Sequence, residues 1–536
     1  MLDSKLALAA MMAVSNLLAQ PSSPSTIRTM IREEGLQHSQ VMTYATQLMD
    51  GIGPRLTGSP NLDKAITWAE KVLKSACCVN VRTESWGKFG MSWQERNVWI
   101  RMTQPDTSPL MARATPWSPP TRGPVIGEVV AIKGFSNEKD FEPFHGKLRG
   151  KIVLFISAPS APVVIPVDKP LFERLSEAQL NEFAAPHTSQ PASEPNLEPI
   201  RLYFERMERA GRFFAAEGVA AVLVPSGNNA QGGVSGGTIY VDTNYTFGWF
   251  VYKREKAIQV PLLVLAVEHY GRLSRLIQSG VPVHAEINVD TRLGSVEKEA
   301  SNLFADIPGV DPLHKHELVM LTAHLDSWAA GTGATDDGAG VVIAMEAMRI
   351  LKAVGVQPAR TIRLALRTGE EQGSLGARAY VHQHLADLRV SQVSNQMGLP
   401  DFLRSLAGPM QPKPDHMRIS AAYTLDAGGG KVRGISTGDP ALMPLFQRWL
   451  EPLRDLGATM VTGRGDCGGD CAIFDHVGIP TPSFKQDPLD YDSRTHHTNA
   501  DLYEHLVPDD LKQAAVVVAT LIFETAVHDE MLPRHK

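Results

Sequence analysis

The sequence predicts an α/β protein: a mixed, mostly parallel central sheet flanked by helices, with a strand-rich domain inserted into the chain. From about residue 300 onward, nearly continuous apolar runs of strand length alternate with stretches of helical periodicity, which is typical of a parallel sheet covered by helices. Between about 125 and 290, short strand-like runs dominate instead. At 536 residues the chain is long enough for more than one domain.

The N-terminal part of the chain, up to about residue 124, contains several segments of different character. Lys5 is followed by the apolar run LALAAMMAVSNLLA and then by a polar segment, so we expect residues 1–20 to be a secretory signal peptide. Residues 25–90 show helix-spaced apolar positions with a Gly- and Pro-containing break, and SWQERNVWIRMT alternates like a strand. The Pro-, Ser- and Thr-rich segment 104–124 indicates a linker. We assign 25–120 to the first part of the main domain.

The segment 121–290 is predicted to be the inserted domain. The runs VIGEVVAI, KIVLFIS, AAVLVPS, VPLLVLA and VHAEINVD have strand character, and RMERAGRFFAAEG and EHYGRLSRLIQSG are helical stretches between them. A part rich in Pro, Ser, Glu and Ala, 160–200, is expected to loop out.

Residues 291–536 are predicted to complete the main domain. HELVMLTAH, ARTIRLALRTG, HMRISAAYTLDAG and IPTPSFKQ have the apolar continuity of buried strands, and the segments GVVIAMEAMRILKAVG, ALMPLFQRWLEPLRDLG and DDLKQAAVVVATLIFETAV are predicted helices. The apolar run 514–523 is too short for a membrane span and is expected to be a core helix. In such sheets, active sites gather beyond the carboxyl ends of the strands.

Histidines and carboxylates occur where those strands are predicted to end. They are His324 and Asp326, Asp336 and Asp337 in a glycine-rich loop, Glu370 and Glu371, Asp426, and His496 and His497. So many charges at one buried edge would repel unless cations compensate them. Imidazole and carboxylate ligands suit zinc, with cobalt or manganese as substitutes. Five ligands exceed the three of one catalytic zinc and suit two metals sharing a carboxylate, with a further Glu as general base.

The series HLDSW, GATDDGAG, RTGEEQGSLGARAY, TLDAG and HHTNADL resembles the two-zinc exopeptidases of clan MH, which include leucine aminopeptidases and the carboxypeptidase Q (plasma glutamate carboxypeptidase) group. NLFADIPG (302–309) is similar to the strand entering that catalytic domain. GKLRGKIVLF and FFAAEGVAAVLV are similar to a protease-associated (PA) domain, which several members carry as an insertion. The resemblance covers most of residues 30–525.

The resemblance implies a role for each residue. Asp336 would bridge two zinc ions, with an unusual cis peptide to Asp337, and Glu370 would be the general base. Asp326 would hydrogen-bond His324 and fix its tautomer, and Asp501 would do similar orienting work. The terminal metal ligands would be His324, Glu371, Asp426 and His497. His497 is preferred because the family pattern has His followed by Thr or Ser, but His496 remains an alternative.

The function expected from this resemblance is hydrolysis of peptide bonds in short peptides or dipeptides by a secreted or periplasmic enzyme. Whether it removes residues as an aminopeptidase or a carboxypeptidase stays open, as do a homodimer and the role of the PA-like domain. Two alternatives remain: a single-zinc acyltransferase like the glutaminyl cyclases, and a non-catalytic receptor-like homologue.

The net charge bears on a nucleic-acid partner, and the positions of the cysteines bear on disulfides. A net charge of −6 without a Lys- or Arg-rich run gives no sign of a nucleic-acid partner. Four cysteines form two close pairs in the sequence. Cys467 and Cys471 could form a disulfide or remain two thiols, while Cys77 and Cys78 are expected to be buried small residues.

Overall fold

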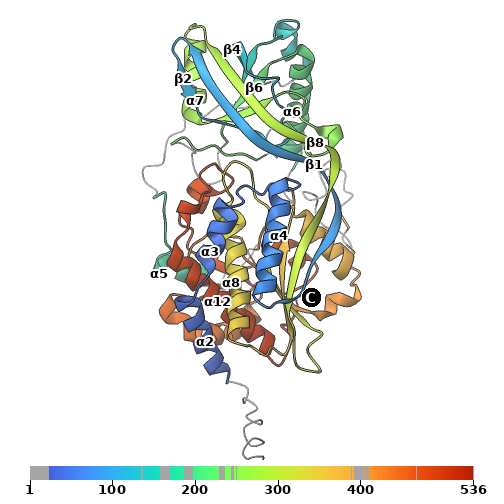
Figure 1. The fold of residues 1–536 in the computed structure, drawn as a ribbon, viewed down its shortest axis with the longest axis vertical. Helices are drawn as coiled ribbons and strands as arrows, with labels where there is room; N and C mark the ends of the chain where they lie inside the picture. Colours follow the sequence, from blue (N-terminus) through green and yellow to red (C-terminus); the bar gives the residue numbers. More distant parts are fainter. Residues whose placement is uncertain are drawn as a thin grey trace, which may run out of the picture.

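The computed structural model describes residues 23–534, except 135–136, 157–169, 186–196, 228–235, 243–246, 249, 388, 391–403, 405–409 and 466. The expected signal peptide, 1–20, lies outside the described residues. Two lobes stand one above the other in Figure 1. The long antiparallel strands β1 (Val79–Gln104) and β8 (His284–Ile307) run through both.

The first lobe, below in Figure 1, contains the mostly parallel sheet that the sequence predicts. Its strands follow the order β13-β12-β14-β11-β9-β10-β8, with parallel pairing of β10 with β9, β9 with β11, β11 with β14, and β12 with β13. The strands are β9 (Leu318–His324), β10 (Thr361–Arg367), β11 (Ile419–Thr424), β12 (Val432–Ser436), β13 (Met460–Thr462) and β14 (Ser483–Gln486).

Helices cover both faces of this sheet. They are α2 (Pro24–Gln37), α3 (Val41–Ala45), α4 (Pro60–Ser75), α8 (Ala339–Ala353), α9 (Leu375–Tyr380), α10 (Met443–Leu450), α11 (Gly469–His476) and α12 (Pro508–Val527). Shorter helical turns are η1 (Thr46–Asp50), η5 (Ala334–Gly338), η6 (Val381–Leu385), η8 (Pro414–Arg418), η9 (Pro440–Leu442), η10 (Glu451–Leu456), η11 (Tyr491–Thr495) and η12 (Tyr503–His505).

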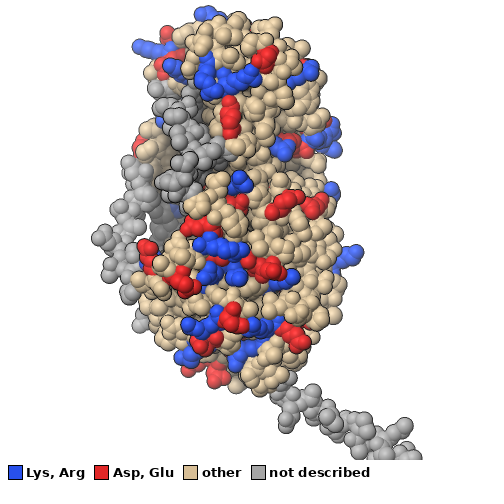
Figure 2. Space-filling model, turned by 90° about the vertical axis from the view of Figure 1, so that its left-hand side faces the viewer, with Lys and Arg blue, Asp and Glu red and all other residues tan. Residues whose placement is uncertain are grey.

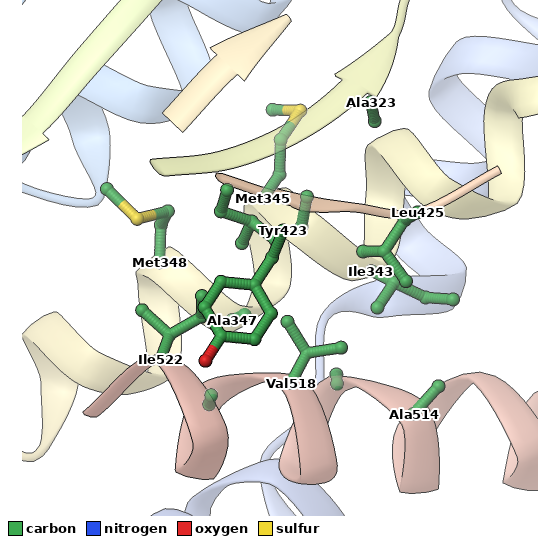
Figure 3. Packing of buried hydrophobic residues seen from close by; sticks show 14 of the residues in the cluster. Ala323, Ile343, Met345, Ala347, Met348, Tyr423, Leu425, Ala514, Val518 and Ile522 are labelled. Atoms are coloured by element: carbon green, nitrogen blue, oxygen red, sulfur yellow. The ribbon is translucent and has the colours of Figure 1, made fainter. Parts of the chain in front are cut away.

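The main core lies between the sheet and the helices α8 and α12. Figure 3 shows Met345 and Met348 of α8 packing near Tyr423 of β11 and Val518 of α12. The Tyr423 hydroxyl, buried at the centre, lies 2.6 Å from Thr525 Oγ1, so its polar end is satisfied. Helix α12 is buried on nearly all sides, as expected for the apolar run 514–523. Among the described residues, no helix is long and apolar enough to cross a membrane.

The second lobe has its own hydrophobic core. It consists of the upper halves of β1 and β8 with β2 (Ser108–Leu110), β3 (Ala112–Ala114), β4 (Val125–Lys133), β5 (Ile152–Ile156), β6 (Ala221–Pro225), β7 (Leu262–Leu265), α6 (Glu198–Glu217), α7 (Val267–Gln278), η2 (Glu138–Phe144) and η4 (Arg254–Lys256). Strands β4, β5, β6 and β7 are parallel. The core includes residues on both sides of the predicted boundaries at 121 and 290, and the assignment of a PA domain stays a prediction.

Two segments differ from their sequence expectations. The expected linker 104–124 contributes β2 and β3, which pair with β1 and β7. The described part of 160–200 does not loop out entirely, because α5 (Glu177–Ala184) lies beside the first lobe in Figure 1. Glu173 pairs with Leu489 as a β-bridge, and the Arg464 guanidinium donates to the Glu182 carbonyl at 2.9 Å. Residues 171–184 are therefore a strap from the second lobe onto the first.

The structure describes all four cysteines. Cys467 and Cys471 form a disulfide, which settles the alternative that the sequence left open. Cys78 is buried, but Cys77 is exposed, so the expectation of burial is wrong for Cys77. Its backbone φ of 62° turns the chain between α4 and β1, and this turn leaves the side chain in solvent.

The surface charges are mixed. On the described part of the face drawn in Figure 2, Lys and Arg side chains alternate with Asp and Glu. A surface of this kind produces no strong field of one sign.

Candidate active site

The candidate residues meet beyond the carboxyl ends of three adjacent parallel strands. His324 is the last residue of β9, Glu370 and Glu371 follow β10, and Asp426 follows β11. Asp336 lies in η5, between Gly333 and α8, and the Asp336–Asp337 peptide is cis, as the resemblance implied. The strand order β11-β9-β10 brings these side chains to one edge of the sheet.

Asp336 lies at the centre of the cluster. Its Oδ1 is 3.3 Å from His324 Nε2, and its Oδ2 is 3.3 Å from His497 Nε2. On the first side, Asp426 Oδ1 lies 3.7 Å from His324 Nε2. On the other side, Glu371 Oε2 lies 3.1 Å from His497 Nε2. Asp336 Oδ1 thus lies on the side of His324 and Asp426, and Asp336 Oδ2 lies on the side of His497 and Glu371.

His496 also lies close to this centre. Its Nε2 is 3.8 Å from Asp336 Oδ2, compared with 3.3 Å for His497. Asp336, His496 and His497 can bring one donor atom each into a common group, as can His324, Asp336 and Asp426. The His497 Nε2 atom also lies 3.1 Å from Glu371 Oε2. Geometry therefore favours His497, whereas His496 packs against Tyr491 at a ring separation of 4.9 Å.

Asp326 supports the cluster in a different way from the one expected. His324 Nδ1 lies 3.1 Å from the Asp326 backbone carbonyl and 3.7 Å from its carboxylate, so the carbonyl is the acceptor that fixes the tautomer. The Asp326 carboxylate accepts hydrogen bonds from the Thr57 hydroxyl at 2.8 Å and from the backbone N–H groups of Glu370 and Glu371 at 3.4 Å. Asp326 therefore positions both glutamates.

Two further carboxylates hold the loop that carries Asp336. Asp501 accepts hydrogen bonds from the Thr335 N–H at 2.6 Å and the Asp336 N–H at 3.2 Å, so it orients Asp336. Asp337 accepts from the His324 N–H and the Gly340 N–H, both at 3.1 Å. Asp337 thus joins the end of β9 to the start of α8.

Arg55 is a support that the sequence reading missed. Its side chain is fully buried and donates to the backbone carbonyls of Leu325, Thr332 and Gly333 at 2.7–2.9 Å. It thereby fastens both ends of the loop between His324 and Asp336. Burial lowers the pKa of this guanidinium, and the surrounding carboxylates oppose that shift. The Gly-Pro-Arg sequence before Leu56 looked like a helix break, and no local pattern marks Arg55 as a loop anchor.

Glu370 borders the open cleft. Its backbone N–H is held by Asp326, and the Ser374 hydroxyl lies 3.5 Å from its Oε1. A Cβ atom at Gly469 would lie 2.6 Å from Glu370 Oε1, and Gly469 has a φ of +53°. Only glycine fits this position without displacing the carboxylate. The cleft has a volume of about 370 Å³. Its lining includes Asp336, Glu370, Glu371, Asp426, Lys485, Tyr491, His496, His497 and the Cys467–Cys471 disulfide.

The electrostatics of the cluster reflect crowded negative charge. Burial, together with neighbouring carboxylates, raises the pKa of Glu370 well above its ordinary value and that of Glu371 to about 8. Burial also raises the pKa of Asp501 to about 7. The pKa of Asp336 is lowered well below its usual range, because His324 and His497 outweigh the effect of its burial. A positive ion in the cluster would favour the ionised form of all these groups.

The residues present fit a pair of metal ions. Among the described residues, His324 Nε2 and Asp336 Oδ2 are buried polar atoms without a hydrogen bond. Such atoms cost free energy unless something binds them. Each side of Asp336 offers one imidazole nitrogen and one further carboxylate, a donor set that suits zinc. In both His324 and His497, Nε2 faces Asp336 and Nδ1 has a separate polar contact.

Those contacts at His497 come from the second lobe. Its Nδ1 is 3.3 Å from the Tyr240 hydroxyl and 3.7 Å from Asp242 Oδ2. On the other side the Trp328 ring meets His497 edge-on at 5.8 Å, and the Trp328 backbone N–H donates to Glu371 Oε1 at 3.2 Å. The sequence reading missed Tyr240 and Asp242, because they follow a Gly- and Ser-rich stretch without any metal-ligand pattern.

Comparison with known proteins is consistent with this geometry. The chain is 25% identical to carboxypeptidase Q of Mus musculus over 496 residues, covering 91% of this chain and 86% of the relative. It is 26% identical to carboxypeptidase Q of Bos taurus over 490 residues, covering 91% and 85%.

Solved structures share the fold. The crystal structure of a peptidase M28 precursor from Shewanella amazonensis has a TM-score of 0.63 at 20% identity, covering 96% of this chain and 99% of that one. The zinc aminopeptidase BSAP from Bacillus subtilis has a TM-score of 0.52 at 17% identity, covering 91% and 95%. Residues 302–522, which contain every candidate ligand, match the profile of peptidase family M28. The similarity to peptidase family M28 thus covers the part of the chain that carries the candidate site.

Proposed function

We propose that this protein is a metal-dependent exopeptidase that hydrolyses peptide bonds of short peptides with two zinc ions. The observation that carries the proposal is the position of Asp336, whose two oxygens each lie 3.3 Å from a different imidazole. In this proposal Asp336 would hold both ions, with His324 and Asp426 holding one and Glu371 and His497 holding the other. Cobalt or manganese could replace zinc with the same donors.

The chain's own groups then have distinct tasks. Zinc ions bound here would polarise the substrate carbonyl and lower the pKa of water. Glu370 accepts the proton of the attacking water and transfers it to the leaving amine. Asp326 holds the Glu370 backbone, and Ser374 contacts its carboxylate, so the base stays beside the cleft. Burial raises the pKa of Glu370, whereas bound zinc would favour its ionised form, which can accept a proton.

The match to the peptidase family and the carboxypeptidase Q relatives support short peptides as the substrate class. Carboxypeptidase Q relatives align with 91% of this chain, and a cleft of about 370 Å³ suits a small ligand. Lys485 on β14 lies in a lining otherwise rich in carboxylates. An ammonium group there offers a counter-charge to a peptide's C-terminal carboxylate. We therefore expect dipeptides with a free C-terminus to be better substrates than their amides.

The test combines metal content with turnover. The purified protein should bind two zinc ions per chain and hydrolyse free dipeptides, and chelation should abolish the activity. Glu370→Gln should lower kcat by about 10²–10⁴-fold while both ions stay bound. Absence of metal-dependent turnover on a panel of free, N-blocked and C-amidated dipeptides would reject the proposal.

Two rival functions give different results in the same experiment. A glutaminyl cyclase-like acyltransferase would bind about one zinc and release ammonia from N-terminal glutamine. A receptor-like homologue would bind peptide without turnover. The complete set of donors on both sides of Asp336 favours the two-zinc hydrolase over both.

The location is proposed to be outside the cytoplasm, in a secreted or periplasmic form. The Cys467–Cys471 disulfide supports this, because disulfides persist in oxidising compartments. Retention of the disulfide in protein isolated from the natural source, measured by mass spectrometry without reductant, tests it.

A further inference from the structure

Among the described residues of the second lobe, Tyr240 and Asp242 contact the outer side of the His497 ring. We propose that Asp242 of the second lobe is the positioning residue that holds the His497 imidazole in its metal-binding orientation. This inference rests on the proposed two-zinc centre and assigns a part of that centre to the second lobe.

The backbone brings the two segments together. The Val241 N–H donates to the His497 carbonyl at 2.9 Å, and the Asn499 N–H donates to the Ile239 carbonyl at 3.0 Å. Tyr240 and Thr498 form a β-bridge between these bonds. The segment 239–242 therefore lies along the loop that carries His497.

His497 needs such support more than His324 does. His324 is the last residue of β9, and its Nδ1 meets a carbonyl only two residues away. His497 instead lies in a loop with a φ of 60°, a left-handed conformation that few non-glycine residues adopt. Neither a strand nor a helix fixes its ring, so the orientation depends on contacts from elsewhere.

The hydrogen-bonding chemistry at Nδ1 leads to Asp242. For Nε2 to offer its lone pair to a metal, Nδ1 must carry the proton and find an acceptor. The Tyr240 hydroxyl is 3.3 Å away, but when it accepts this proton it must donate its own hydrogen. The Tyr240 hydroxyl lies 3.5 Å from Asp242 Oδ2, which can accept that hydrogen, and Asp242 Oδ2 is also 3.7 Å from Nδ1. Whether His497 Nδ1 donates directly or through the Tyr240 hydroxyl, the final acceptor is the Asp242 carboxylate.

The Asp242 side chain is also buried. The Asp242 residue is only 7% exposed, and a buried carboxylate is unfavourable unless polar partners face it. An outer carboxylate on a metal-bound imidazole raises the basicity of the ligand nitrogen and fixes the ring, and removing it costs about 10–100-fold in metal affinity. The second lobe would thus contribute to zinc affinity without supplying a ligand.

The experiment measures zinc binding to the full-length apoprotein by competition with a chromophoric chelator. Asp242→Ala should weaken one of the two zinc ions by about 10–100-fold and leave the other unchanged. Asp242→Asn, which keeps the shape and one acceptor, should give a smaller loss of that same ion. Activity of both variants should recover when zinc is raised to saturation.

Two control variants separate positioning from general disturbance. Tyr240→Phe should cost only a few-fold, because the carboxylate can still accept from Nδ1. Glu268→Ala removes an acceptor for the Gly236 and Gly237 N–H groups, which lie just before the segment 239–242. Its zinc affinity should equal that of the wild type.

The outcomes are distinct. A wild type that binds no zinc rejects the proposed function itself. A wild type with two zinc ions and Asp242 variants of equal affinity overturn the inference alone. Losses in Tyr240→Phe or Glu268→Ala as large as in Asp242→Ala also overturn it, because the segment would then matter only as structure.

Discussion

The two halves of the candidate metal centre are built differently. The His324 half comes from the ends of neighbouring strands of one sheet, and His324 finds its Nδ1 acceptor two residues away. The His497 half comes from a loop, and its Nδ1 faces Tyr240 across a separation of 257 residues in the chain. One half depends on local sheet geometry, and the other depends on how the two lobes meet.

This difference shows where the centre is vulnerable. Strand ends in a buried parallel sheet are held by ladder hydrogen bonds and by packing on both faces. A loop that is held from several directions can lose its geometry when any one support is lost. Asp336 belongs to both halves, so variants at Asp336 and around the His497 loop should separate the two kinds of dependence.

The largest effect is expected from Asp336→Ala. Because this carboxylate contacts both His324 and His497, its removal should lose both halves at once. Zinc content should fall from two ions towards none, and kcat/KM should fall by at least about 10³-fold. Retention of one tightly bound zinc, measured by atomic emission after dialysis, would show that the halves are independent.

An intermediate effect is expected from opening the Cys467–Cys471 disulfide. The bridge lines the cleft next to Gly469 and closes a loop of 4-residue sequence separation, which the loop-entropy model values at roughly 2 kcal/mol. In Cys467→Ser/Cys471→Ser, KM should rise several-fold while zinc content stays at the wild-type value. Loss of zinc from this double variant would mean that the bridge supports the metal ligands as well as the cleft wall.

The smallest effect is expected at His505, which fastens the far end of the His497 loop. Its Nδ1 lies 2.7 Å from Asp490 Oδ2, and this hydrogen bond raises the pKa of His505 above its ordinary value. A raised folded-state pKa means that the stabilisation is fully present below the unfolded pKa of about 6.5 and is lost as the pH rises through the folded pKa.

His505→Gln should therefore increase amide hydrogen exchange in residues 490–505 at pH 6 by about five-fold, corresponding to about 1 kcal/mol. The difference from the wild type should shrink towards pH 9. A difference that is constant with pH would contradict the ion pair, and exchange in β9 serves as the internal control.

The sequence predicted the His324 half better than the surroundings of the His497 half. Strands β9, β10 and β11 are continuous apolar runs, so their ends and the acidic residues beyond them are visible in the chain itself. The supports Arg55 and Asp242 carry no such pattern, because their partners lie more than 250 residues away. The strap 171–184 was missed because a polar segment gives no local sign of the surface that it contacts.

The pair of strands β1 and β8 has a consequence for engineering and for evolution. Each strand begins in one lobe and ends in the other. Asn302 Oδ1 of β8 accepts a hydrogen bond from the Thr368 N–H at 3.1 Å, and Thr368 lies two residues before Glu370. A graft that replaces the second lobe by cutting at its visual boundary would sever two continuous strands and the ladder between them, close to Glu370. Functional chimaeras between relatives should therefore exchange both strands whole, with crossover points before Val79 and after Ile307.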